Sequence, residues 1–148
     1  MEPAGAPPGR VLGLDLGDAR VGVAISDPDR RLAMPLGTVH VGQPPGELMA
    51  IAALVDEHDV GLVVLGNPLS MSGEVGPSSR HAEAFADALR ALVRVPIELQ
   101  DERLSTVEAE RSLREAGLTG RARRRIVDRS AATVILQAWL DAHGRYPP

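Results

Sequence analysis

The stretch Val11-Leu12-Gly13-Leu14-Asp15-Leu16-Gly17 decides the fold of this chain. It is an apolar run that contains one acid. Alternation places the leucines on one face of a strand and Gly13 and Asp15 on the other. A carboxylate between apolar residues of a central strand costs desolvation energy unless it is hydrogen-bonded, paired or bound to a cation. Asp15 therefore either caps the turn at Gly17 and Asp18 or meets partners from later in the chain.

The length and composition indicate a single domain with an aliphatic core. The chain has 148 residues, which is long enough to bury a proper core. Aromatic residues make up only 2% of it, so stacking of bases on aromatic side chains is largely excluded as a binding mode. The absence of cysteine excludes disulfides, thiolate metal sites and cysteine nucleophiles. All 16 basic residues are arginine, which excludes Schiff-base and P-loop lysine chemistry.

The start of the chain predicts no structure of its own. Residues 1–9 are rich in proline and glycine, and we expect a disordered leader there, ahead of one domain at residues 10–146. No apolar run approaches membrane-spanning length, and the first ten residues lack the apolar core of a signal peptide. We therefore expect a soluble, cytoplasmic protein that does not bind membranes.

The spacing of apolar residues predicts the element order β-β-β-α-β-α-β-α-α. Strands are expected at residues 10–16, 21–26, 31–41, 60–66 and 96–100, and helices at about 47–58, 77–93, 106–116 and 123–143. An antiparallel meander of three strands, followed by alternating helices and strands, predicts a five-stranded mixed sheet with helices on both faces. In such sheets, sites form beyond the carboxyl ends of the strands.

Two later acids could meet Asp15 at that end of the sheet. Glu102 follows the fifth strand, and Asp128 heads the apolar face of the last helix, in line with Ala132 and Ile135. An acid on a core-facing stripe is out of place unless it points into a site. Three converging carboxylates suit Mg²⁺, which takes carboxylate oxygens and keeps waters and substrate phosphates as its other ligands. Two such ions about 4 Å apart can activate water and stabilise the leaving oxygen in phosphodiester cleavage.

Arginines gather beside these acids. Between residues 103 and 129, eight arginines stand against four acids on a chain whose net charge is −4. Five of these arginines crowd the start of the last helix, where positive charges oppose the helix dipole, so helix stabilisation explains them poorly. A clamp on a phosphate backbone is favoured over a solvated charged face. The residues assigned to nucleic-acid binding are Arg20, Arg103, Arg121, Arg123, Arg124 and Arg125. For Arg20 and Arg103, pairing with a neighbouring aspartate is the alternative.

The histidines and one loop carry weaker signals. His40, His58, His81 and His143 have no metal-binding spacing, and we expect ordinary surface or strand-end positions for them. Residues 67–76 are small and turn-forming. They fit either a plain connection into the next helix or a mobile lid over the site.

Four motifs resemble the YqgF/RuvX family and occur in the order of that family. They are Gly13 to Asp27 (GLDLGDARVGVAISD), Gly66 to Gly73 (GNPLSMSG), Asp101 to Thr106 (DERLST) and Asp128 to Gln137 (DRSAATVILQ). The resemblance covers nearly the whole chain after the leader and implies an RNase H-like fold of the Holliday junction resolvase group. It also implies a nuclease that matures the 5′ end of pre-16S ribosomal RNA, with Asp15, Glu102 and Asp128 as catalytic and metal-binding carboxylates.

The chain departs from these families at a few positions. Asn67 and Ser72 stand where the family often has leucine and aspartate, which concerns the loop and not the carboxylates. Related RuvC resolvases carry a further acid three residues before the last one, where this chain has Arg125. The implied cofactor is Mg²⁺ or Mn²⁺, as two ions of which the second binds weakly or only with substrate.

Three classes of function fit these residues. The first is a metal-dependent endonuclease acting on structured RNA, in which a metal on Asp15 and Asp128 activates water and Glu102 is shared between the ions. The second is a Holliday junction resolvase that cuts branched DNA as a dimer. The third is a non-catalytic RNA-binding or transcription factor on the same scaffold. A kinase-type phosphate loop is excluded, because that class needs two such domains. No base-reading element is visible, so RNA and DNA both fit, as do a monomer and a homodimer.

Overall fold

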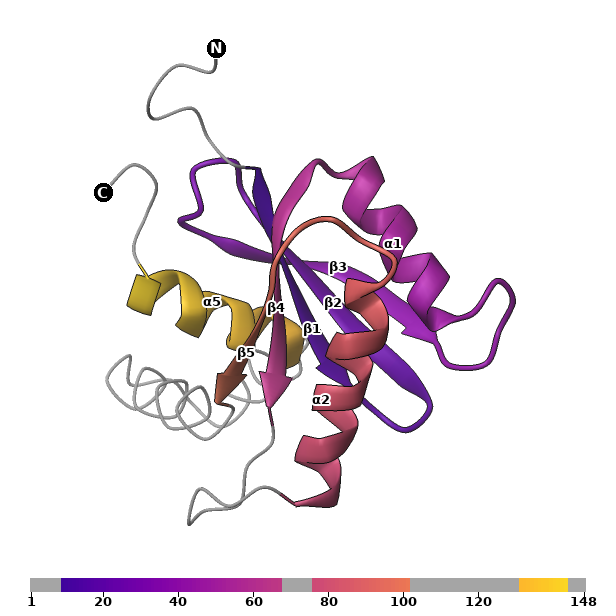
Figure 1. Ribbon diagram of the computed structural model, residues 1–148. Coiled ribbons are helices and arrows are strands. Elements are labelled where there is room, and N and C mark those ends of the chain that lie inside the picture. The colour runs from indigo at the N-terminus through magenta and orange to yellow at the C-terminus, as the bar shows by residue number, and fades with distance from the viewer. Residues whose placement is uncertain (1–8, 68–75, 102–130, 144–148) are drawn as a thin grey trace, which may run out of the picture.

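The structure is a computed structural model, and it describes residues 9–67, 76–101 and 131–143. Its elements are β1 (Arg10–Leu16), β2 (Arg20–Ser26), β3 (Ala33–His40), α1 (Glu47–Glu57), β4 (Val60–Asn67), α2 (Pro77–Arg90), β5 (Ile97–Asp101) and α5 (Ala131–His143) (Figure 1). The strands and helices expected in these ranges are confirmed, although several begin or end a few residues away from the expected positions. Three expectations lie outside the described residues: the helix at 106–116, the first part of the last helix, and the leader apart from Gly9.

The five strands form one mixed sheet in the order β3-β2-β1-β4-β5. The meander β1-β2-β3 is antiparallel, whereas β4 runs parallel to β1 and β5 runs parallel to β4. The three parallel strands end at Leu16, Asn67 and Asp101, and this end of the sheet is called the carboxyl edge. The opposite end, where they begin, is called the amino edge. The expected α/β fold with a five-stranded mixed sheet is confirmed.

Different helices cover the two faces of the sheet. Leu12 and Leu14 belong to the apolar layer shared with α1 and α2, whereas Val11 belongs to the layer shared with α5. Figure 1 shows α5 on the side of the sheet opposite α1 and α2. The α5 face is tightly packed at Gly13, where an added Cβ would lie 2.7 Å from the Cβ of Leu136. Only glycine at this position allows the helix to approach so closely.

Polar groups at the amino edge bond to one another. The buried Ser26 Oγ accepts the N–H of Val11 at 2.9 Å and donates to the carbonyl of Asp27 at 2.9 Å. The Arg10 guanidinium donates to the carbonyl of Ser26 at 3.1 Å. These bonds join the end of β2 to the beginning of β1.

The carboxylate of Asp27 organises the turn between β2 and β3. Its Oδ1 accepts the N–H groups of Arg31 at 2.7 Å and Leu32 at 2.9 Å. Burial acts to raise the pKa of Asp27, but these two N–H groups and the charge of Arg31 outweigh it and hold the pKa below its ordinary value. The ionised carboxylate therefore stabilises the folded turn.

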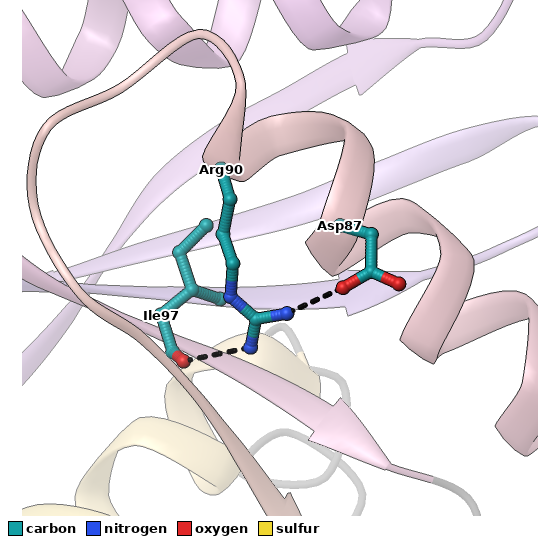
Figure 2. Close-up of polar contacts among 3 residues, drawn as sticks. All are labelled: Asp87, Arg90 and Ile97. Atoms are coloured by element: carbon teal, nitrogen blue, oxygen red, sulfur yellow. Dashed lines mark hydrogen bonds and ion pairs between the residues drawn. The ribbon is translucent and has the colours of Figure 1, made fainter.

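Arg90 joins the last turn of α2 to β5. Its guanidinium donates to the Asp87 carboxylate at 2.6 Å and to the carbonyl of Ile97 at 3.2 Å (Figure 2). Both side chains of the ion pair are largely exposed, so the pair itself contributes little to stability. The bond to Ile97 fixes where β5 begins. Within the described ranges, no helix has the length and apolar character needed to cross a membrane.

Candidate active site

Asp15 lies at the carboxyl edge, on the face of the sheet that α5 covers. Its Cα pairs with Gly22 of β2. A Cβ built on Gly22 would lie 3.8 Å from the Cβ of Asp15 and 3.7 Å from the Cβ of Ala132. Asp15 is half-buried. The sheet therefore holds this carboxylate beside the first turn of α5.

The strand register also sets what lies on the other side of Asp15. Leu14, Leu65 and Leu99 form one row across the parallel strands. In the following row, Asp15 lies beside Gly66 of β4. Gly22 pairs with Asp15, so the position directly opposite Asp15 on β2 carries no side chain.

The other two expected carboxylates lie outside the described residues. This holds for Glu102 and Asp128, and also for the arginines Arg103, Arg121, Arg123, Arg124 and Arg125. Among the residues that the structure describes, no group of three acidic or histidine side chains could hold a metal ion.

A strip of exposed side chains crosses β2 and β3 beyond Asp15. Gly22 pairs with Thr38, and Arg20 pairs with His40. Val21, which lies between these pairs on β2, belongs to the apolar layer of α1 and α2. By alternation, Arg20, Thr38 and His40 therefore share the α5 face with Asp15, and all three are exposed.

Arg20 is the one expected nucleic-acid-binding residue that the described ranges contain, and it shares the face of Asp15. Sequence reasoning did not select Thr38, and it treated His40 as an ordinary strand-end residue. The missed signal is the pairing register of β2 with β3, which places His40 opposite Arg20.

The end of β4 is tied to α2. Ser79 is fully buried, and its Oγ donates to Oδ1 of Asn67 at 2.6 Å. Asn67 is one of the two loop positions at which the sequence analysis noted a departure from the family pattern. Here its side chain accepts a hydrogen bond from Ser79. Ser72 and residues 68–75, on which the lid interpretation depends, lie outside the described residues.

Comparison with known protein families shows which family the chain belongs to. A family model described as "RuvX: Holliday junction resolvase" matches residues 9–142. The chain belongs to the RuvX family. A relative from Anaeromyxobacter sp. is 52% identical over 132 residues, covering 89% of this chain and 96% of the relative. A relative from Pelotomaculum thermopropionicum is 44% identical over 137 residues, covering 92% and 89%.

Both relatives are named as candidate pre-16S rRNA nucleases. The family description and the names of the relatives agree on an enzyme that hydrolyses phosphodiester bonds. The expected enzyme class, a nuclease of the RuvX family, is therefore confirmed.

The solved structures support the fold of the RuvX chain. Thermus thermophilus RuvC in complex with a Holliday junction substrate aligns with a TM-score of 0.56 and 12% identity, covering 95% of this chain and 99% of RuvC. A second structure of the same RuvC aligns with a TM-score of 0.53 and 12% identity, covering 94% and 99%. At this identity the likeness shows the fold alone, and the expected RNase H-like fold is confirmed.

Proposed function

We propose that this protein is a metal-dependent endonuclease that cleaves pre-16S ribosomal RNA in its 5′-end maturation in the cytoplasm. The observation that carries the proposal is the position of Asp15. It lies at the carboxyl edge of a RuvX-family sheet, between two glycines and beside α5. The names of the relatives support the choice of substrate. We take residues 10–146 as one nuclease domain behind a short leader.

Asp15, Glu102 and Asp128 are proposed to hold Mg²⁺ or Mn²⁺. Asp15 fits a hard cation, because it offers carboxylate oxygens at a half-buried position of the carboxyl edge. In the sequence, Glu102 directly follows Asp101, the last residue of β5, and Asp128 comes three residues before Ala131, the first described residue of α5. Bound ions would lower the pKa of the attacking water and stabilise the charge on the leaving oxygen.

The protein's own contribution is to fix the geometry. Gly13 lets α5 pack directly on β1, the central strand that carries Asp15. Such preorganisation on rigid elements is what catalytic ligands need.

A second candidate function is cleavage of branched DNA by a homodimer. The description of the RuvX family as a junction resolvase favours it. Two sites related by two-fold symmetry would make the paired cuts that resolution of a junction requires. The chemistry at Asp15 would be the same, and only the substrate and the oligomeric state would differ.

Cleavage of two matched substrates by the purified full chain tests these proposals. The substrates are a precursor 16S rRNA 5′ end and a four-way DNA junction, each with Mg²⁺ or Mn²⁺. We expect cleavage of the RNA, and we expect Asp15→Asn to lower the rate at least about 100-fold, because even the partners of metal ligands cost 10–100-fold when removed. Asp29→Asn, which removes an exposed acid near the amino edge, is the control and should cut at the wild-type rate.

Each other outcome selects a different function. Full activity of the Asp15→Asn variant would exclude Asp15 as a catalytic ligand. Cleavage of the junction alone would select the resolvase. Binding of RNA without cleavage that depends on Asp15 would select the non-catalytic RNA-binding factor.

A further inference from the structure

We propose that Arg20, Thr38 and His40 bind the phosphate and sugar groups of the nucleic-acid strand beside the cleaved bond. In this proposal the strand passes from Asp15 across β2 to the outer strand β3. The inference deepens the proposed function, and it rests on that function because Asp15 marks where cleavage takes place. The three residues are called the β2–β3 strip.

The pairing register makes the β2–β3 strip continuous with Asp15. Asp15, Gly22 and Thr38 form one row across β1, β2 and β3, and Arg20 and His40 form the row two residues farther toward the carboxyl edge. Neighbouring strands are about 4.8 Å apart, so the Cα atoms of Asp15 and Thr38 are roughly 10 Å apart. The second row lies about 7 Å farther along the strands. These spacings give a polar surface a few nucleotides long.

The described part of α5 leaves this surface open. Its first turn lies at Gly22, and from there the helix runs toward the amino edge, where Gln137 accepts the N–H of Ala33 at 2.8 Å. Arg20 and His40 lie two residues beyond Gly22 toward the carboxyl edge and are exposed, as is Thr38. The same face of the sheet is therefore apolar and covered at one end and polar and exposed at the other.

The absence of a side chain at Gly22 is not required by packing. A Cβ at Gly22 would make only ordinary contacts, at 3.7 and 3.8 Å, whereas a Cβ at Gly13 would collide with Leu136 at 2.7 Å. Glycine inside a strand often marks a place where a ligand or another backbone approaches closely. At Gly22 the element that approaches is α5, through Ala132, so the nucleic-acid strand would pass on the carboxyl-edge side of this contact, over Arg20 and His40.

The chemistry of the β2–β3 strip suits a nucleic-acid backbone. The guanidinium of arginine can donate two parallel hydrogen bonds to one phosphate. The threonine hydroxyl and the histidine ring add donors that can also reach the sugar. Half to two-thirds of protein–DNA hydrogen bonds go to phosphate and sugar, and such contacts fix the register of the strand without reading its sequence.

Binding of labelled single-stranded RNA with the pre-16S 5′ sequence tests the proposal, with DNA of the same sequence measured in parallel. All variants are made in the full chain carrying Asp15→Asn, so that the probe stays intact. We expect Arg20→Ala to weaken binding roughly tenfold and to reduce the slope of log affinity against log salt by about 0.7. We expect His40→Ala and Thr38→Val to weaken it about two- to fivefold each, and the double variant about tenfold.

Matched controls separate a binding role from a structural one. Arg94→Ala and His58→Ala remove the same kinds of side chain near the amino edge and should bind like the parent chain. Thr38→Ser keeps the hydroxyl and should retain the affinity that Thr38→Val loses. Equal melting temperatures of all variants show that each has folded. In the chain with Asp15 intact, the same substitutions should raise KM more than they lower kcat.

The results distinguish this proposal from the proposed function. If the folded Arg20→Ala variant and the folded Thr38→Val/His40→Ala double variant bind RNA like the parent chain, the proposed binding role of the β2–β3 strip is wrong, even if cleavage depends on Asp15. Affinity that depends on the strip, found with a wild-type chain that does not cut RNA, would support the strip and overturn the pre-rRNA nuclease. A wild-type chain that binds neither probe would overturn both.

Discussion

The two edges of the sheet use their polar residues differently. At the amino edge, Ser26 and Asp27 bond to backbone groups of the strands and the turn beside them. At the carboxyl edge, Arg20 and His40 are exposed to solvent next to the half-buried Asp15. The first arrangement satisfies the buried N–H group of Val11 and the N–H groups of the turn after β2, and it stabilises the fold. Arg20 and His40, being exposed, contribute little to the stability of the fold.

The contrast implies that substitutions at the two edges separate stability from activity. Changes at the amino edge should lower the free energy of unfolding and leave cleavage intact in the protein that remains folded. Changes at the carboxyl edge should do the reverse. Gly13 lies between the two edges, where the packing of α5 connects them.

The largest effect on stability is expected for Gly13→Ala. The added Cβ would lie 2.7 Å from the Cβ of Leu136 and 3.2 Å from the carbonyl oxygen of Ala132. Neither atom can rotate away, so we expect a loss of about 3 kcal/mol, at the upper end of the usual range for overpacking. Because α5 must move away from Asp15, the cleavage rate should fall as well. Urea denaturation and single-turnover cleavage, both at low temperature, measure the two effects.

Gly22→Ala is the matched control for this prediction. Its Cβ makes ordinary contacts, so its free energy of unfolding should stay near the wild-type value. An equal loss of stability in the two variants would show that α5 packs as closely on Gly22 as on Gly13, and the comparison between the two glycines would fail.

An intermediate effect is expected for Ser26→Ala at the amino edge. The substitution removes the only hydroxyl that accepts the N–H of Val11, and Val11 is fully buried. Leaving a buried donor unsatisfied costs about 1–3 kcal/mol, so we expect a loss of roughly 2 kcal/mol in denaturant unfolding. Below the melting temperature, cleavage per folded molecule should match the wild type. A fall in kcat in the folded Ser26→Ala variant would contradict the claim that the amino edge affects stability and not catalysis.

The fold was largely predictable because the apolar pattern is strong where strands are central. The run at residues 11–14 and the run at 60–66 are buried on both faces, so the sequence contains little that could pair in another way. Strand and helix ends were less predictable, because the pairing partner decides where a strand stops. β2, for example, begins at Arg20, whose carbonyl oxygen accepts the N–H of Gly17 at 2.9 Å.

Residues of the candidate site could be predicted only where the alternation of the sequence shows which face of the sheet a residue lies on. Asp15 lies inside a clear alternation, so its face follows from its neighbours. His40 does not, because the register between β2 and β3 shifts between Val23 and Ala24, and only the observed pairing shows which face it shares. The roles of Glu102 and Asp128 follow from the family motifs and stay predictions.

The smallest expected effect, that of Asp27→Asn, depends on pH. The pKa of Asp27 is lowered in the folded chain, so its ionised form stabilises the fold at every pH above the unfolded value near 3.8, and this contribution is lost as the pH falls through the folded pKa. Asparagine keeps an oxygen acceptor for the N–H groups of Arg31 and Leu32 but removes the charge. Because the turn is partly exposed, we expect a loss below about 1 kcal/mol near pH 7.

The difference between wild type and Asp27→Asn should shrink in urea unfolding experiments as the pH falls below about 3.8 and through the folded pKa, because the wild-type carboxylate then becomes protonated too. A gap that stayed constant until the wild-type turn is fully protonated would mean that the amide disturbs the turn by its shape, and the stabilising role of the charge would be wrong. Cleavage at neutral pH should be unaffected, because Asp27 lies at the amino edge of the sheet, whereas Asp15 lies at the carboxyl edge.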